Sequence, residues 1–502
     1  MSFASRVCRS FCVLWTVATG ALAAGCTWTG LGGDSRWANS GNWEGNTAPS
    51  GNADQAIFPA GTPTACTVDA STSVKCIYFR NPGMTLTIAS GVNLALDYLG
   101  ALTLRAEEDA TIDGDGTLTF SVNTGENFAD NQAYPGKTLT ITAKITGANG
   151  FEHNGTGGTI VLGNAANDQT GNTLLTGAGA LSVASVANAG VACPLGAGSA
   201  FKFSYGPSTF LFTGTSGSTD RSFYQNANAS QDVTIEHAGS GTLTFTGSFL
   251  GNNYNHAFVF NVDAPSAVVE NAGVIANGGT GSLLVYKQGA GKQVLSAANT
   301  YTGNTVVDQG TLALTASGSI SASSLLRLRG GALLLNDGTP ASTYTKTFGT
   351  LQIENTASTV TVAPGATSAQ VTFASLSYAS GSIDFSAEGL GSTTKIFISG
   401  QAEGLIGAWA TVSGGAALAA YSASVGVYAA DLPVQTLSAL GPSTITNNPG
   451  SVASITEVGS SDGISLADDP TRIALLSQQV GTNAAVSRSE EHTSELQSRL
   501  HL

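Results

Sequence analysis

The most concentrated group of acidic side chains ahead of the C-terminal segment is Glu107-Glu-Asp109 with Asp113-Gly-Asp-Gly116. Such a group could bind calcium or supply a pair of catalytic carboxylates, as in β-helical glycosidases. The calcium-binding nonapeptide Gly-Gly-x-Gly-x-Asp and a twelve-residue EF-hand loop are both absent here. The alternative is an exposed turn, in which the Asp-Gly pairs adopt a positive φ. We favour the turn.

A nucleophile motif of the form Gly-x-Ser-x-Gly occurs at Gly459-Ser-Ser-Asp-Gly463. A nucleophile elbow needs a buried strand before the serine and a helix directly after it. This match lies in a Ser-rich segment and favours a surface loop. His153, His237 and His256 are scattered and share no metal or triad spacing. We therefore predict no catalytic residue, no metal ligand and no cofactor.

Basic residues are sparse, with 19 Lys and Arg among 502 residues. A polysaccharide-lyase site needs clustered Asp with Arg or Lys on neighbouring coils, and no such set can be assembled from the sequence. Lys287 and Lys292 flank a turn, and we expect both to be solvated. We keep a β-helical carbohydrate-active enzyme, of polysaccharide lyase or glycosidase type, as the alternative to the non-enzymatic function described below.

Four cysteines follow the N-terminal segment, namely Cys26, Cys66, Cys76 and Cys193. In an exported chain such residues are either disulfide-bonded or inert in the core. The stretch from Cys66 to Cys76 reads as strand, turn, strand, which makes these two the candidate disulfide. Zinc would need tighter paired spacing and a nearby His.

Short apolar strands separated by Gly, Asn, Ser and Asp dominate residues 287–314. Branched residues favour an extended backbone, and Gly and Asn supply turns. The same order of Ala-Ala-Asn, Thr-Gly-Asn-Thr and an apolar strand occurs in residues 154–183. An internal repeat of this kind is typical of a solenoid, in which each unit must stack on its neighbours.

The unit at 287–314 resembles the autotransporter-associated β-strand repeat of bacterial surface proteins. The copy at 154–183 is looser, because Asp168-Gln169 replaces Thr-Tyr. The resemblance implies a β-helical fold and export, and it names no substrate. The matching positions are Gly289, Gly291, Leu295, Asn299, Thr300, Tyr301, Thr302, Gly303, Thr305, Gly310, Leu312 and Leu314.

Strands recur every 8–20 residues in the first part of the chain, which fits two or three strands per coil. We predict an all-β, right-handed parallel β-helix over 61–431, in one elongated body. The alternation Thr-Leu-Thr-Phe at 117–120 places Leu118 and Phe120 inward. Residues 25–60 hold three Trp, which could form a sugar-stacking surface but are better read as a cap over the first coil.

The two ends of the sequence differ from the middle. Residues 1–24 have the basic, apolar and small-residue regions of a secretory signal. A rival interpretation makes Cys26 a lipidated cysteine. Residues 432–487 read as a linker or the start of a next module, with a short helix over 469–480. Residues 488–502 resemble a translated sequencing adapter, so the native C-terminus is expected to be missing.

The formal net charge of -14 disfavours a nucleic-acid partner, which needs a basic surface. Membrane attachment would come only through a missing C-terminal anchor or through N-terminal lipidation. The late segment Leu405-Ile-Gly-Ala-Trp-Ala-Thr-Val412 also resembles the same secreted proteins, and its Trp is expected in core or junction packing. We expect a non-enzymatic exported passenger at the bacterial cell surface. Its function would be display or adhesion, with carbohydrate or other cell-surface material as partner.

Overall fold

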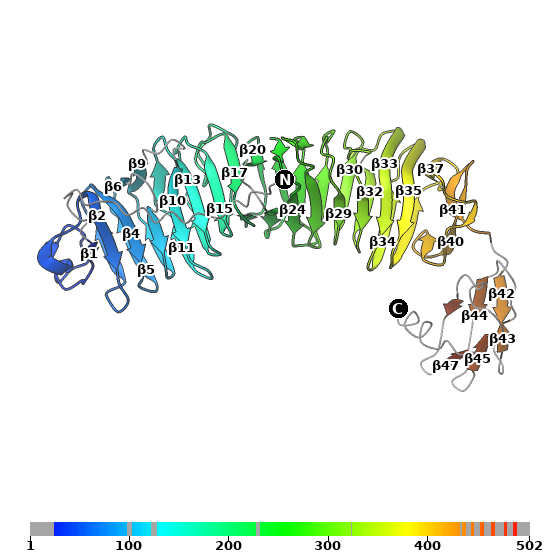
Figure 1. Ribbon diagram of the computed structural model, residues 1–502, viewed down its shortest axis with the longest axis horizontal. Coiled ribbons are helices and arrows are strands. Elements are labelled where there is room, and N and C mark those ends of the chain that lie inside the picture. The colour runs from blue at the N-terminus through cyan, green and yellow to red at the C-terminus, as the bar shows by residue number, and fades with distance from the viewer. Residues whose placement is uncertain are drawn as a thin grey trace, which may run out of the picture.

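The structure is a computed structural model that describes residues 25–431 apart from 98–102, 122–127, 227–230 and 323, together with six strands between 434 and 488. The 25–431 part is an elongated stack of coils (Figure 1). Almost every strand pairs in parallel with the equivalent strand of the next coil. The predicted all-β parallel solenoid is therefore confirmed.

Three long sheets form the faces of the solenoid. The first sheet contains β1 (Gly25–Thr27), β2 (Gly51–Phe58), β4 (Thr72–Phe79), β6 (Asn93–Asp97), β7 (Leu104–Ala106), β9 (Thr117–Ser121), β10 (Phe128–Ala133), β12 (Lys144–Thr146), β13 (Gly150–Gly155), β15 (Thr173–Gly177), β17 (Ala200–Ser204), β20 (Ser222–Gln225), β23 (Phe249–Leu250) and β26 (Ile275–Ala276).

The second sheet runs along most of the body. It contains β3 (Ala65–Val68), β5 (Met84–Ile88), β8 (Ala110–Asp113), β11 (Thr138–Ile141), β14 (Thr159–Leu162), β16 (Ala180–Val183), β18 (Thr209–Phe212), β21 (Val233–His237), β24 (Ala257–Val262), β27 (Leu284–Gln288), β29 (Thr305–Val307), β31 (Leu326–Leu328), β33 (Thr343–Ile353), β35 (Ser368–Tyr378) and β37 (Thr394–Ile398).

The third sheet begins midway along the body. It contains β19 (Gly217–Thr219), β22 (Thr242–Phe245), β25 (Val268–Asn271), β28 (Lys292–Leu295), β30 (Thr311–Thr315), β32 (Ala332–Asp337), β34 (Ala357–Val362), β36 (Ser382–Ala387), β38 (Gly404–Leu405), β39 (Ala410–Val412), β40 (Ala417–Ser422) and β41 (Gly426–Ala429).

Alternating side chains build the core between the sheets. In β9, Leu118 and Phe120 are buried while Thr117 and Thr119 face outward, as the sequence pattern predicts. Each fully buried Leu or Phe contributes about 1.5–3 kcal/mol by leaving water. Coil length varies, because 20 residues separate the paired Val285 and Thr305 but 27 separate Leu333 and Val360. Coils of different length still pair in register because their turns differ in length.

A cluster of three Trp closes the N-terminal end, next to two short 3₁₀ turns, η1 (Ser40–Asn42) and η2 (Glu44–Asn46). Trp28, Trp37 and Trp43 are at most 2% exposed, and all three pack on Phe58. Their indole N–H groups donate to the carbonyls of Pro63, Pro49 and Trp37. Rings buried in this way cannot present a sugar-stacking surface, so they act as the cap.

An antiparallel meander closes the described solenoid at its other end. β39 pairs with β40, and β40 pairs with β38 and β41, all antiparallel. Trp409 stacks on Tyr378 of β35 with ring centroids 4.1 Å apart, so it packs at a junction as the sequence suggests. The parallel pairing of the third sheet thus changes to antiparallel pairing at β39.

Six strands follow in two three-stranded parallel sheets. These are β42 (Val434–Leu437), β43 (Ser443–Ile445), β44 (Val452–Ile455), β45 (Gly463–Leu466), β46 (Leu476–Gln478) and β47 (Ala485–Arg488). The helix expected over 469–480 is wrong at 476–478, which form β46 and pair with β44. Other predictions for residues 1–24 and 489–502, and for most of the motif at 459–463, lie outside the described residues.

The candidate disulfide is not formed. Cys66 lies in β3 of the second sheet and Cys76 in β4 of the first sheet, and both are buried free thiols. Burial also raises the pKa of the Cys76 thiol. The prediction treated consecutive strands as neighbours in one sheet. In a solenoid they belong to different faces, and the in-sheet neighbours come from adjacent coils.

Candidate functional site

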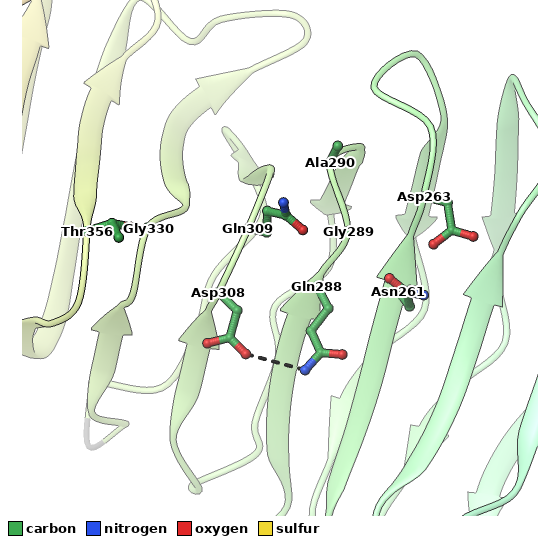
Figure 2. Close-up of a pocket in the computed structure, with 9 residues that line it drawn as sticks. All are labelled: Asn261, Asp263, Gln288, Gly289, Ala290, Asp308, Gln309, Gly330 and Thr356. Atoms are coloured by element: carbon green, nitrogen blue, oxygen red, sulfur yellow. Dashed lines mark hydrogen bonds between the residues drawn. The ribbon is translucent and has the colours of Figure 1, made fainter. Parts of the chain in front are cut away.

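A concave surface lies along the corner between the second and third sheets, and we call it the corner groove (Figure 2). Its volume is about 690 Å³, and it crosses the stacked turns that follow β24, β27, β29, β31 and β33. Since one coil of a parallel sheet advances about 4.8 Å, these five coils span about 19 Å. The groove is lined by Asn261, Asp263, Gln288, Gly289, Ala290, Asp308, Gln309, Gly330 and Thr356.

An outward column of polar side chains runs along the corner groove, and its members Asn261, Gln288 and Asp308 line the groove. Asn261 is paired with Gln288 on the next coil, and the Gln288 amide donates to the Asp308 carboxylate over 3.3 Å. Arg329 then lies 3.2 Å from Asp308 and 3.8 Å from Glu354. The column is held in line by the parallel ladder, in which the backbone N–H groups of Asp308, Arg329 and Glu354 each donate to a carbonyl of the coil before.

Lys287 lies directly beneath this groove and is fully buried, so the expectation of a solvated lysine is wrong. Its Nζ donates to the carbonyls of Gln288 at 2.5 Å, Gly289 at 2.6 Å and Gln309 at 3.2 Å. The ammonium thus ties two consecutive turns together. Lys292 is partly exposed and forms an ion pair with Asp337 at 2.9 Å.

The charge of Lys287 is costly in this position. Desolvation lowers the pKa of its amine to about 8, and attraction by Asp263 partly offsets this effect. At neutral pH the amine is still mostly protonated. It therefore places a positive charge behind the groove floor while Asp263 faces the opening.

The glycines of the repeat permit neighbouring coils to stack closely. Gly289 and Gly310 have φ values of 73° and 64°, which favour glycine. A Cβ on Gly310 would lie 2.4 Å from the carbonyl oxygens of Gly289 and of Gly291. A Cβ on Gly303 would meet the Leu283 carbonyl at 2.3 Å. These repeat positions therefore need glycine for a steric reason.

The other repeat residues satisfy polar groups inside the coil. The Tyr301 hydroxyl is buried and lies 2.7 Å from the Thr305 hydroxyl. Asn299 accepts from the backbone of Ile275 and donates to Ser319, and so joins three coils. Leu312 is a fully buried core residue. The repeat motif thus specifies stacking and contributes Gly289 to the groove.

Replacing Gly310 with alanine tests the stacking role. We expect a loss of unfolding free energy at least about 2 kcal/mol larger than for Gly338→Ala. Gly338 also has a positive φ, of 79°, but a Cβ there would meet nothing within 4 Å. Denaturant unfolding of both variants measures the difference. Equal losses would show that backbone strain alone accounts for the effect.

The acidic residues at 107–115 form surface ion pairs and a turn. Glu107 lies 3.1 Å from both Arg80 and Arg105, and Glu108 pairs with Lys137. Gly114 has a φ of 103°, in agreement with the turn interpretation. Within the described part of the chain, no group of three or more His, Cys, Asp or Glu could hold a metal ion.

The three histidines remain apart in the structure. His153 is buried between the carbonyls of Asn131 and Gly158, and desolvation lowers its pKa. His237 is buried against the ring of Phe212. His256 lies 3.7 Å from Asp232 near the surface. None of them reaches the corner groove.

Carboxylates on consecutive coils were the feature expected of the alternative enzyme. Along the outward column, however, Asp308 and Glu354 are held by Arg329 and Arg327. Both carboxylates are therefore already engaged in ion pairs. Glu236, one coil before Asn261, does have a raised pKa through desolvation and then repulsion from Asp263. It is not among the residues that line the groove.

Comparison with known proteins places this geometry in context. Residues 285–314, which include Lys287 and the groove glycine Gly289, match the family model of the passenger-associated-transport-repeat. The resemblance noted from the sequence is thereby confirmed.

A relative extends the likeness beyond this repeat. Over 311 residues the chain is 28% identical to the "Adhesin BmaC autotransporter" of Brucella suis biovar 1 (strain 1330). The match covers 55% of this chain and 9% of that protein. No solved structure matches the chain significantly. The described residues include no helix long and apolar enough to cross a membrane.

Proposed function

We propose that this chain is part of the passenger of an exported bacterial surface protein and that it acts in adhesion without catalysis. One observation carries the proposal. The passenger repeat at 285–314 lies within a continuous parallel solenoid, and the chain is similar to an autotransporter adhesin. A stack of this kind holds turns and side chains at fixed intervals along a rod, which suits it to display and multivalent contact.

The location and the partner belong to the same proposal. The rod would stand at the bacterial cell surface, since passenger repeats mark exported chains. Its partner would be carbohydrate or other polar cell-surface material. The sparse charge, 10% of residues, supports contact through many weak hydrogen bonds rather than through strong ion pairing.

Attachment of protein-coated beads to cultured epithelial cells tests this function. Beads that carry the purified full chain should attach at several times the level of beads that carry albumin. Beads that carry the same chain after thermal unfolding should fall to the albumin level, because the surface depends on stacked coils. Attachment no better than albumin, by protein whose circular dichroism shows intact β structure, would overturn the adhesive role.

A further inference from the structure

The corner groove differs from the rest of the outer surface in its lining. Side-chain amides and carboxylates from consecutive coils face it together, with Asn261 and Asp263 on one coil, Gln288 on the next and Asp308 on the third (Figure 2). Amides supply both donors and acceptors, and carboxylates supply paired acceptors. Such groups bind vicinal hydroxyls, which both donate and accept.

The charge arrangement selects against an anionic ligand. The carboxylates of Asp263 and Asp308 line the opening, whereas the cations stand behind or beside it. Lys287 is buried beneath the floor, with all three Nζ hydrogen bonds directed to backbone carbonyls. Arg329 is engaged by Asp308 and Glu354. The charged residues in the groove lining are Asp263 and Asp308, so a carboxylated or sulfated chain would face like charge on the lining itself.

The dimensions favour a linear ligand. The groove follows the long axis, and each of the five coils contributes at least one lining residue, with a step of about 4.8 Å per coil. One ring of an extended hexose chain has nearly the same length as this step. Gly289 and Gly330 line two of the five turns and contribute no side chain that could block the path of a linear ligand.

We infer that the corner groove binds a neutral, extended oligosaccharide, which lies along the long axis with about one sugar unit per coil. The inference rests on the proposed adhesive function and gives it a site and a ligand class. Gln288 lies on the second of the five coils, between Asn261 and Asp308. Its amide is oriented by Asp308, and it follows Lys287, whose bonds hold the turn in place.

Calorimetric titration of the full chain with cellohexaose tests the inference. We expect a Kd on the order of 1 mM or tighter for the unmodified protein. Gln288→Ala and Asp263→Ala should each weaken binding by about five-fold or more, which is about 1 kcal/mol. Gln370→Ala is the matched control, since Gln370 is an exposed glutamine on β35 of the same sheet and lies outside the groove.

Several outcomes would overturn the inference. The first is that the folded, unmodified protein does not bind cellohexaose. The second is that Gln288→Ala and Asp263→Ala bind cellohexaose as tightly as the unmodified protein does. The third is that the unmodified protein binds an oligogalacturonate of the same length as tightly as cellohexaose. Shortening of the cellohexaose during the titration would contradict the non-enzymatic proposal instead. The bead assay distinguishes failure of the groove proposal from failure of the adhesive function. If the beads attach to cells but the protein does not bind cellohexaose, the groove proposal is wrong and the adhesive function stands.

Discussion

Replacing Trp43 with alanine will lower the free energy of unfolding by about 3–5 kcal/mol, the range for removing a large aromatic side chain from a packed interior. Trp43 is 2% exposed and contacts the rings of Trp28, Trp37 and Phe58. Its loss leaves a cavity among the rings of Trp28, Trp37 and Phe58. Denaturant unfolding followed by tryptophan fluorescence measures the change.

Trp409→Ala serves as the control for ring removal. Trp409 is only partly buried and stacks on Tyr378, which is 39% exposed. We expect a loss of about 1–2 kcal/mol there, because the surrounding solvent replaces the ring without a cavity. If the two variants lost equal stability, the N-terminal cluster would have no special role as a cap.

The unfolding free energy should rise with pH between about 8 and 10.5, and Lys287→Met should remove most of that rise. The pKa of Lys287 is about 8 in the folded chain against an ordinary value of 10.5. Within this interval the unfolded chain binds more protons than the folded chain, so raising the pH favours folding. The full effect is about 3 kcal/mol, from about 1.4 kcal/mol per pKa unit.

The quantity to compare at each pH is the difference in unfolding free energy between the unmodified chain and Lys287→Met. Tyrosines also titrate in this interval, and burial raises the pKa of Tyr301, but Tyr301 is present in both proteins. Lys292→Met is the matched control, since it removes a partly exposed amine that is paired with Asp337. Parallel pH profiles for the unmodified chain and Lys287→Met would show that the amine is solvated after all.

Local sequence pattern predicted much of this fold. Alternation gave the inward direction of Leu118 and Phe120, and clustering of Trp in residues 25–60 gave the cap. Alternation along β27 also predicts an inward Lys287, because Lys287 is two residues from the apolar, inward Val285 and so lies on the same face of the strand. The expectation of a solvated lysine instead followed its charge. Burial is possible because three backbone carbonyls of two turns converge on its Nζ.

The corner groove could not be predicted in the same way. Its lining residues come from five coils, and coil length varies between 20 residues at Val285 and 27 at Leu333. Only the register of the coils brings Gln288 next to Asn261 and Asp308. The disulfide prediction failed for the same reason, because the in-sheet neighbours of Cys66 and Cys76 lie on other coils.

The direction of the backbone hydrogen bonds has a mechanical consequence. In the solenoid these bonds run between coils, along the long axis, so tension on the two ends of the rod pulls directly on them. The bonds of one coil then break together while the remaining coils stay stacked. A coil of 20 or 27 residues, such as those that start at Val285 and Leu333, releases roughly 70 or 90 Å of extended chain when it opens. Under tension the solenoid would therefore lengthen in discrete steps, one coil at a time.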